Sequence, residues 1–195
     1  MQTGPRLRAD SFPKESQVKM NVLVAYASAH GSTAEMAAFI ADRLRERDFE
    51  VTVASVEEVQ TLDGFDAFVL GSAIHGGMWL TPMGRFIDRF NADFAGRPAF
   101  LFMSCIRVLE PDGPQHVVQH YVNYDALRSL NLREVKPFAG KLEMSAIDWD
   151  ERWTLAARYD GSAAPGSFNR DFRDWNAIRA WADKVADSLL TGAGR

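Results

Sequence analysis

The sequence predicts one α/β domain built around a parallel β-sheet. Short, nearly continuous apolar runs alternate with segments in which apolar residues recur every three or four positions. The first pattern is typical of strands covered on both faces, and the second is typical of amphipathic helices. Strands that alternate with helices form βαβ units, in which successive strands are parallel. A length of 195 residues and a hydrophobic content of 47% fit a single globular domain.

Five segments are expected to form the strands. The first four are short apolar runs, whereas the fifth is weaker because Pro137 interrupts it. Between the second and third strands only the segment Glu57–Gly64 is available, which is enough for a loop or a single helical turn. In chain order, the expected strands are Met20–Tyr26, Val51–Val56, Ala67–Ser72, Pro98–Ser104 and Val135–Phe138.

Four apolar faces predict the helices. The second helix is expected to have Thr81 as its N-cap and Pro82 at its first position. The last face predicts a core-forming helix over Asp171–Leu190. The faces are Met36, Ala37, Ile40 and Leu44; Met83, Phe86, Ile87 and Phe90; Val117, Tyr121, Tyr124 and Leu127; and Trp175, Ile178, Ala182, Val185 and Leu189.

Composition and charge exclude several classes of protein. The net charge of −4 disfavours a uniformly basic nucleic-acid surface. No apolar run approaches the roughly 20 residues of a transmembrane helix. Cys105 is the only cysteine, so the chain has no internal disulfide, which fits a cytoplasmic protein. We therefore expect a polar arm over residues 1–19, one domain over residues 20–190 and a tail over residues 191–195.

One connection is longer than the βαβ pattern requires. Residues 140–170 form an inserted segment between the fifth strand and the last helix. It contains Trp149, Trp153 and Tyr159, followed by a stretch rich in Gly, Ala, Pro and Ser. Connections in such folds are usually about 2–6 residues long, and much longer loops are often functional or disordered.

A hydroxyl-rich turn follows the first expected strand and leads directly into a helix. Gly31 can adopt a positive φ, and the backbone N–H groups at the start of a helix favour an anion, so this turn predicts a phosphate cradle. It is neither a Walker A loop nor a dinucleotide fingerprint, and a capped turn without a ligand is the structural alternative. The turn consists of Ser28, Ala29, His30, Gly31, Ser32 and Thr33.

Two further loops are expected at the same edge of the sheet. Ligands of open α/β sheets bind beyond the carboxyl ends of the strands, where the strand order reverses. The loops after the third and fourth strands are therefore predicted to contact the same ligand, with Trp79 stacking on it or forming a wall of the pocket. Their candidate residues are Ser72, Ala73, Ile74, His75, Gly76, Gly77, Trp79, Ser104, Cys105, Ile106 and Arg107.

Together these segments resemble the flavodoxin family. The hydroxyl-rich turn at residues 28–33 stands where flavodoxins carry their FMN phosphate loop, and the order of elements matches over about residues 20–190. Three features resemble the branch that contains menaquinone-dependent protoporphyrinogen IX dehydrogenase. They are the third-strand loop at residues 71–77, the inserted segment, and the sequence Asp171-Phe172-Arg173-Asp174-Trp175-Asn176.

The resemblance implies a flavodoxin-like, doubly wound sheet of five parallel strands in the order 2-1-3-4-5, with helices on both faces. It implies an FMN-dependent oxidoreductase of the protoporphyrinogen or quinone dehydrogenase type. No side chain need act as an acid or a base, so no catalytic residue is assigned. The alternatives are a flavodoxin-like electron carrier and an NAD(P)H:quinone reductase. The expected partners are a small-molecule substrate or a quinone, or a redox protein, and peripheral membrane contact stays open.

The other histidines carry a less specific signal. His116 and His120 are four residues apart on an expected helix, which is a spacing that can bind a metal. The sequence provides no evident third ligand, so a solvated helix face is favoured and no metal site is predicted.

Overall fold

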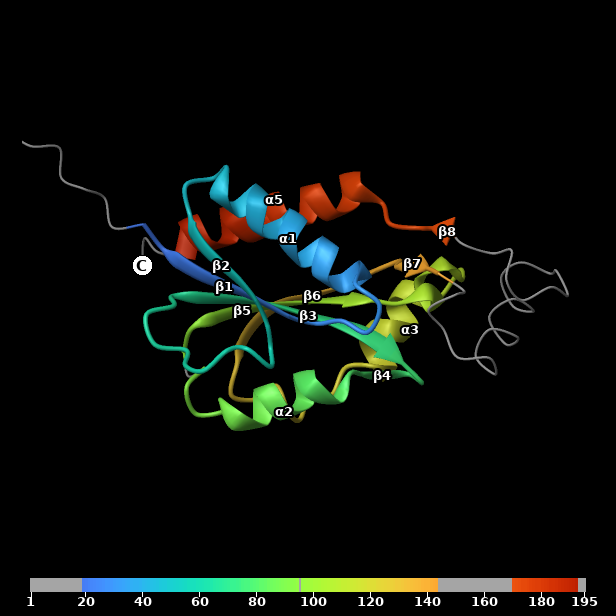
Figure 1. The fold of residues 1–195 in the computed structure, drawn as a ribbon, viewed down its shortest axis with the longest axis horizontal. Coiled ribbons are helices and arrows are strands. Elements are labelled where there is room, and N and C mark those ends of the chain that lie inside the picture. The colour runs from blue at the N-terminus through green and yellow to red at the C-terminus, as the bar shows by residue number, and fades with distance from the viewer. Residues whose placement is uncertain (1–18, 95, 144–169, 193–195) are drawn as a thin grey trace, which may run out of the picture.

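The computed structural model describes residues 19–94, 96–143 and 170–192. Within them, the strands of the main sheet are β1 Asn21–Ala27, β2 Glu50–Ser55, β3 Ala67–His75, β4 Met78–Trp79, β5 Pro98–Ser104 and β6 Asn131–Phe138. Five of these strands are parallel, in the order β2-β1-β3-β5-β6, and β4 pairs antiparallel with the end of β3. The five parallel strands therefore have the predicted order 2-1-3-4-5 (Figure 1).

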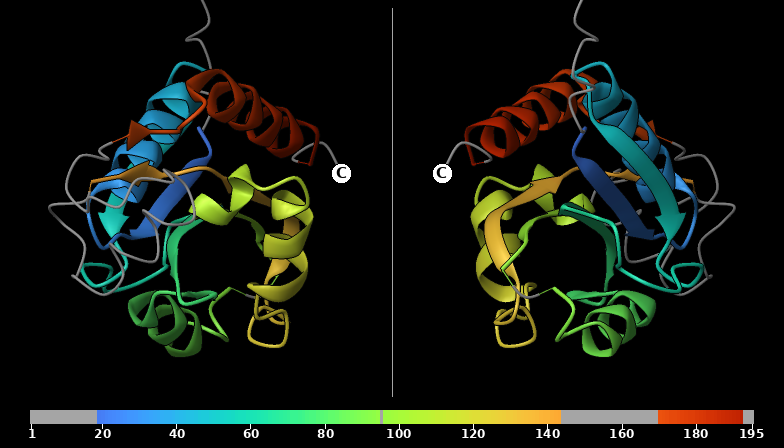
Figure 2. Two further views of the ribbon diagram at one scale, coloured as in Figure 1. Left: turned by 90° about the vertical axis from the view of Figure 1, so that its right-hand side faces the viewer. Right: turned by 90° about the vertical axis from the view of Figure 1, so that its left-hand side faces the viewer.

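Helices cover both faces of this sheet, as expected for a doubly wound fold. The helices are α1 Ser32–Arg45, α2 Thr81–Arg89, α3 Gly113–His120 and α5 Trp175–Gly192, with a short 3-10 helix, η1, at Ile106–Leu109. Figures 1 and 2 show α1 and α5 on one face and α2 on the other. None of the helices in the described ranges is both long enough and apolar enough to span a membrane.

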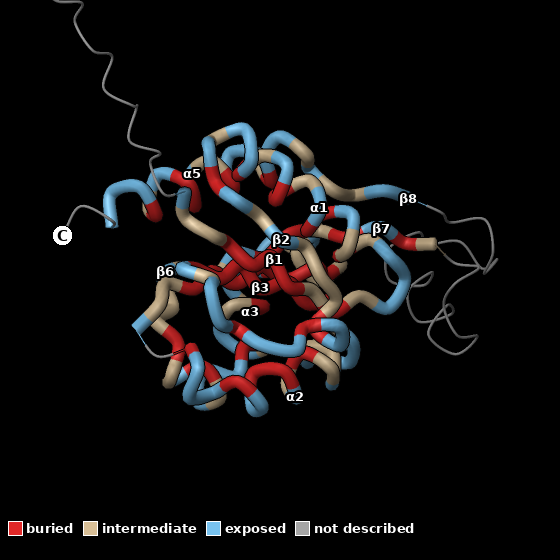
Figure 3. Tube along the Cα trace, turned by 60° about the vertical axis from the view of Figure 1, so that its left-hand side comes forward, coloured by how far each residue is buried: buried red, intermediate tan, exposed pale blue. Residues whose placement is uncertain are grey.

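Two hydrophobic cores lie on the two faces of the sheet. Alternate residues of one strand belong to different cores: Phe68 and Leu70 of β3 pack with α2, whereas Val69 packs with α1 and α5. Buried positions accordingly follow one another along β1 and β3 in Figure 3. Burial on both faces explains why these strands are continuous apolar runs in the sequence.

Two strands are longer than predicted. β5 has the predicted bounds, whereas β3 continues to His75 and β6 begins at Asn131. β6 contains Pro137, which the sequence analysis treated as an interruption. Within the described sheet β6 pairs only with β5, and a proline is tolerated in an edge strand because one side of that strand needs no ladder hydrogen bonds. Residues 57–64 form turns and loop without a helix.

Two helix predictions need correction. Leu80, not Thr81, is the N-cap of α2, and Pro82 is its second residue. The third predicted face does not form one helix, because α3 ends at His120 and the chain then turns. The Asn123 side chain accepts a hydrogen bond from the Ala126 backbone N–H at 3.2 Å, which stabilises a turn in place of further helix.

The last helix forms as a core element, with a later start than predicted. The Asp174 carboxylate accepts hydrogen bonds from the N–H groups of Asn176 and Ala177, both at 3.0 Å, and this cap fixes the start of the helix. Trp175 was predicted to lie on its buried face but is only partly buried, against Phe39. Trp181 is the tryptophan of α5 that enters the core, with 3% of its surface exposed.

The inserted segment is described only at its two ends. There β7, Lys141–Leu142, pairs antiparallel with β8, Arg170–Asp171. Its central residues, which include Trp149, Trp153 and Tyr159, lie outside the described residues, as do residues 1–18 of the predicted arm. The chain therefore leaves and rejoins the domain at one place, near the carboxyl ends of the strands (Figure 1).

Candidate functional site

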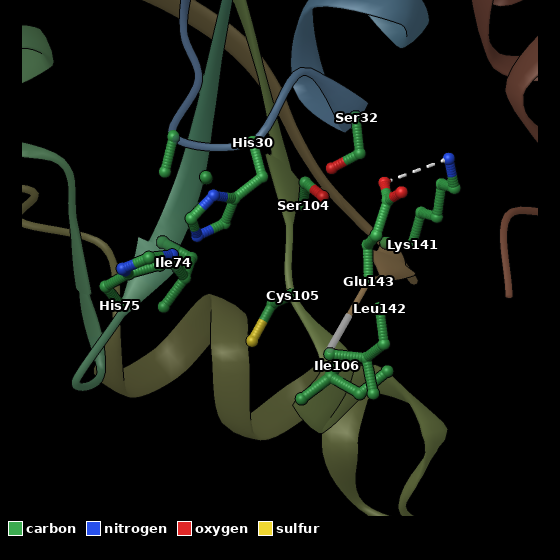
Figure 4. Close-up of a pocket in the computed structure, with 13 residues that line it drawn as sticks. His30, Ser32, Ile74, His75, Ser104, Cys105, Ile106, Lys141, Leu142 and Glu143 are labelled. Carbon is green, nitrogen blue, oxygen red and sulfur yellow. Dashed lines mark ion pairs between the residues drawn. The ribbon is translucent and has the colours of Figure 1, made fainter. Parts of the chain in front are cut away.

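A pocket lies at the carboxyl edge of the sheet, where the loops after four parallel strands meet (Figure 4). The loops after β1, β3 and β5 were predicted to converge here, and each contributes to the lining. The loop after β6 and the short strand β7 complete it. The lining residues are Ala29, His30, Ser32, Ala73, Ile74, His75, Ser104, Cys105, Ile106, Gly140, Lys141, Leu142 and Glu143.

The turn between β1 and α1 has the backbone geometry of an anion cradle. Gly31 is the N-cap of α1 and has a φ of +87°, which favours glycine. The Gly31 N–H donates to Ser28 Oγ at 3.0 Å, which closes the turn. No side chain within the described ranges caps the start of α1, so the N–H groups of its first turn are available to an anion.

The Thr33 hydroxyl is a buried donor without a partner among the described residues. Thr33 has no exposed surface, and its Oγ1 has no hydrogen-bond partner within the described part of the chain. A buried hydroxyl left unpaired costs about 1–3 kcal/mol, so such groups usually mark a bound water, an ion or a ligand. Thr33 lies in the first turn of α1, next to Ser32 of the pocket lining, but does not itself line the pocket.

The loop after β6 packs closely over the same region. A Cβ on Gly140 would lie 2.7 Å from Ser104 Oγ and 3.9 Å from Ser32 Oγ. A glycine allows the backbone to approach the Ser104 hydroxyl this closely, whereas the distance to Ser32 is an ordinary contact. Ser32 and Ser104 therefore reach one small volume from α1 and β5, as Figure 4 shows.

Two histidines line another part of the pocket. The ring centroids of His30 and His75 are 5.8 Å apart, with an angle of 32° between the planes. His30 comes from the turn between β1 and α1, and His75 comes from the end of β3. Figure 4 shows the two rings near Ile74. The structure thus brings together two histidines that are 45 positions apart in the sequence.

The pocket also contains a thiol and an ion pair. Burial raises the pKa of the Cys105 thiol, so this group stays protonated at neutral pH and packs as a small apolar side chain. Ile106 and Leu142 add apolar surface beside it. Lys141 Nζ lies 3.3 Å from Glu143 Oε2, so one charge of each sign stands at the pocket.

Several predicted site residues lie elsewhere. Ser72 is fully buried, and its hydroxyl bonds the backbone of Ala73 and Leu80. Gly76 and Gly77 form the turn between β3 and β4, with φ values of +56° and +78°. Both are turn residues of the hairpin rather than part of the pocket lining.

Trp79 and Arg107 also point away from this pocket. Trp79 lines a separate hollow between the β3–β4 hairpin and α2, together with Tyr121. Arg107 forms ion pairs with Glu110 and Asp112 beside α3. The three predicted loops do meet at this edge, and each supplies residues to the pocket lining. The side chains of Trp79 and Arg107 are not among the lining residues.

Sequence reasoning missed the residues that the last third of the chain contributes. Gly140 and the three residues after it follow the fifth strand of the parallel sheet. Ligands of such sheets bind beyond the carboxyl ends of the strands, so these residues could have been predicted as part of the pocket. Arg173 is different: its guanidinium lies 3.5 Å from the Ser32 carbonyl oxygen, although 141 positions separate the two residues. No spacing in the sequence indicates this contact.

Metal binding finds no support in the described ranges. Nowhere in residues 19–94, 96–143 and 170–192 do three or more His, Cys, Asp or Glu side chains form a group that could hold a metal ion. His116 and His120 stack on each other on α3, with ring centroids 4.6 Å apart.

Comparison with solved structures gives the fold. A cysteine-to-serine mutant of flavodoxin from Pseudomonas aeruginosa has a TM-score of 0.54 at 14% identity, over 88% of this chain and 99% of that chain. Rubredoxin oxygen:oxidoreductase from Desulfovibrio gigas has a TM-score of 0.59 at 14% identity, over 91% of this chain and 38% of that chain. The similarity to the flavodoxin shows a flavodoxin-like fold.

Sequence comparison gives the family. Protoporphyrinogen IX dehydrogenase [quinone] from Escherichia coli strain K12 is 19% identical over 176 residues, which cover 86% of this chain and 95% of that protein. The family model described as a flavodoxin domain matches residues 23–164, which is more than half of the chain. The chain therefore belongs to the flavodoxin domain family, and this membership implies a flavin cofactor.

Proposed function

We propose that the pocket binds FMN, with the phosphate at the start of α1. The observation that carries this proposal is the buried, unpaired hydroxyl of Thr33 beside the uncapped first turn of the helix. A phosphate oxygen would give this hydroxyl and the first-turn N–H groups their missing partners. Ser28 and Ser32 supply further hydroxyls, so one terminal phosphate fits the donors of this turn.

The remaining lining fits the flat ring of a flavin. Ala73 and Gly140 keep the backbone close to the pocket, and Ile74, Ile106 and Leu142 provide apolar contacts. Bound FMN would supply the transfer of one or two electrons. The residues of this chain would bind and orient the ring and limit the access of water to it. No side chain is assigned the role of acid or base.

We further propose an oxidoreductase of the protoporphyrinogen or quinone dehydrogenase type. The similarity to the E. coli dehydrogenase supports this class, because it extends over 95% of that protein. The inserted segment supports it as well, since the segment leaves the domain at Glu143, which lines the pocket, and β7 pairs with β8 where the chain returns. A substrate held near the pocket could therefore contact this segment.

Flavin titration tests the cofactor proposal. Apoprotein should bind FMN more tightly than riboflavin, because riboflavin lacks the phosphate that the α1 turn would hold. FAD should bind less tightly than FMN, because the turn lacks a dinucleotide fingerprint. Binding is measured by the loss of flavin fluorescence. If riboflavin binds as tightly as FMN, the turn does not bind the phosphate.

A deletion tests the enzyme against the carrier. Replacing residues 144–169 with a short Gly/Ser bridge keeps Glu143 and the β7–β8 pair, so FMN binding should be nearly unchanged. Anaerobic reduction by a porphyrinogen, followed by reoxidation with a quinone, should occur in the full chain and be lost in the deletion variant. Unchanged turnover would refute a substrate role for the segment.

The alternative outcomes identify the other classes. A full chain that exchanges electrons with a reductase or a ferredoxin, without turnover of a small molecule, would be an electron carrier. Reduction by NAD(P)H with a quinone as acceptor would identify a quinone reductase. Either result would leave the FMN proposal in place and overturn the dehydrogenase proposal.

A further inference from the structure

The guanidinium of Arg173 is a buried cation that contacts the first turn of α1. The side chain of Arg173, in the segment between β8 and α5, is only 4% exposed. Its guanidinium donates to Glu35 Oε2 at 2.7 Å, to Asp171 Oδ1 at 2.8 Å and to Asp171 Oδ2 at 2.6 Å. It also reaches the Ser32 carbonyl oxygen at 3.5 Å. Arg173 therefore connects the segment between β8 and α5 with the first turn of α1.

The position of Arg173 is fixed on several sides. Its guanidinium stacks on Trp175 with 4.5 Å between Cζ and the ring centroid, and Trp175 in turn packs on Phe39 of α1 with a ring-centroid distance of 5.0 Å. Next to it, the Phe172 N–H donates to the Gly140 carbonyl oxygen at 3.1 Å. Gly140 belongs to the pocket lining, so Arg173 is held against both the pocket and α1.

The ion pair between Arg173 and Glu35 affects how strongly the first turn of α1 can bind an anion such as a phosphate. Glu35 lies in the first turn of α1, two residues after Thr33, so an unpaired carboxylate there would repel a phosphate at the same turn. Arg173 pairs this carboxylate and holds it in contact with the guanidinium. The bidentate bond to Asp171 keeps the guanidinium in that place and also lowers the pKa of the Asp171 carboxyl.

We propose that Arg173 is a positioning residue for phosphate binding: it pairs with Glu35, which reduces the repulsion by that carboxylate, and holds the first turn of α1 so that a phosphate monoester can bind there. This inference rests on the proposed FMN site. It assigns a function to a residue outside the turn, whose own sequence contains no Lys or Arg. It also gives the segment between β8 and α5 a role in phosphate binding.

The test compares FMN with riboflavin in four proteins: wild type, Arg173→Met, Glu35→Gln and the double variant. Methionine retains apolar bulk against Trp175 while it removes the charge. Arg173→Met should weaken FMN about tenfold and change riboflavin less than about twofold, because only FMN carries the charge that Glu35 repels. Glu35→Gln should leave FMN binding unchanged or slightly tighter. In the double variant, FMN affinity should return to within about threefold of wild type.

Two additional measurements separate electrostatics from structure. Raising the salt concentration should restore part of the FMN affinity of Arg173→Met, because salt screens the repulsion by Glu35. Arg43→Met is the matched control, since Arg43 also pairs with two carboxylates, Asp183 and Glu46, but near the other end of α1. It should leave the ratio of FMN to riboflavin affinity unchanged.

The outcomes distinguish this inference from the proposed function. If wild type does not prefer FMN to riboflavin, the phosphate site itself is wrong. If wild type prefers FMN and Arg173→Met has the same preference, or loses both flavins equally, Arg173 has no role in phosphate binding. If Arg173→Met does not fold, Arg173→Lys and Arg173→Gln provide the same comparison. Lysine should then keep the preference for FMN, glutamine should reduce it, and equal preference in both would overturn the inference.

Discussion

The two ends of α1 are built in different ways. At its N-terminal end, Gly31 has a positive φ, no described side chain caps the helix, and the Thr33 hydroxyl is buried without a described partner. At its C-terminal end, Leu44 is fully buried, and Arg43 and Arg47 pair with carboxylates of α5. One end leaves polar groups unsatisfied within the described protein, whereas the other end satisfies them.

This difference separates binding from stability along a single helix. Unpaired buried donors reduce the stability of a fold, and they persist where a ligand compensates for them. Buried leucines and ion pairs between helices stabilise the fold and do not require a ligand. Substitutions at the C-terminal end should therefore change the free energy of unfolding, and those at the N-terminal end should mainly change flavin binding.

The largest effect is expected for Leu44→Ala, at the C-terminal end of α1. Leu44 has no exposed surface and packs in the core between the sheet and α5. Its truncation should reduce the free energy of unfolding by about 2–5 kcal/mol, since it leaves a cavity. Urea denaturation measures this loss. The preference for FMN over riboflavin should be unchanged, and a changed preference would mean that the two ends of the helix are not independent.

Gly31→Val at the opposite end should have a smaller effect on stability and a larger effect on binding. Among the described residues, no atom outside the chain neighbours lies within 4 Å of a Cβ at this position, so the cost is backbone strain and not a steric clash. At a φ of +87°, this strain should cost about 1–3 kcal/mol for a β-branched residue. If the turn relaxes to relieve the strain, FMN affinity should fall sharply and riboflavin affinity should fall less. If wild type and Gly31→Val bound FMN with equal affinity, the turn at residues 28–33 would not be a phosphate cradle.

Thr33→Val should change stability and binding in opposite directions. Valine keeps the shape of threonine and removes the unpaired buried hydroxyl, so the apoprotein should be as stable as wild type or more stable. FMN binding should weaken by about 1–2 kcal/mol, the scale of one lost hydrogen bond. Chemical denaturation without flavin and fluorescence titration with FMN give the two values. A loss of stability in the apoprotein would show that the hydroxyl has a protein partner.

The sequence predicted the fold better than the site, and particular residues show why. The strand at Pro98–Ser104 was located correctly because burial on both faces leaves a continuous apolar run. Local signals also located the turn at residues 28–33, where Gly31 has the predicted positive φ. The fifth strand was expected to be weak because whether Pro137 is tolerated depends on the strand's place at the edge of the sheet. Its start at Asn131 was missed because Arg133 and Glu134 break the apolar run.

The directions of side chains were harder to predict. Trp79 and Arg107 follow the right strands but contact α2 and nearby carboxylates instead of the pocket. Arg173 was missed as a site residue because its contact with Ser32 arises only when the chain returns to the sheet after the inserted segment. Such contacts depend on tertiary packing, which has no periodic signal in the sequence.

The smallest effect concerns the ion pairs at the two ends of α1 in acid. Hydrogen bonds from Arg43 lower the pKa of the Asp183 carboxyl, and those from Arg173 lower the pKa of Asp171. A carboxyl with a lowered pKa in the folded state stabilises the protein above its unfolded pKa, about 3.9 for aspartate. This contribution is lost as the pH falls through the lower, folded value.

Unfolding free energies measured between pH 6 and pH 2 should therefore decrease below about pH 4. Asp183→Asn should make this decrease shallower and cost less at neutral pH than the core and turn substitutions above, because Asp183 stays partly exposed. Asp183→Asn should leave the preference for FMN over riboflavin unchanged.

Asp171→Asn should make the acid decrease shallower as well. It should also weaken FMN binding, since Asp171 holds the guanidinium that pairs with Glu35. If both variants left FMN binding equal to wild type, the ion pairs at the two ends of α1 would be alike in function, and the difference between the ends would be confined to Gly31 and Thr33.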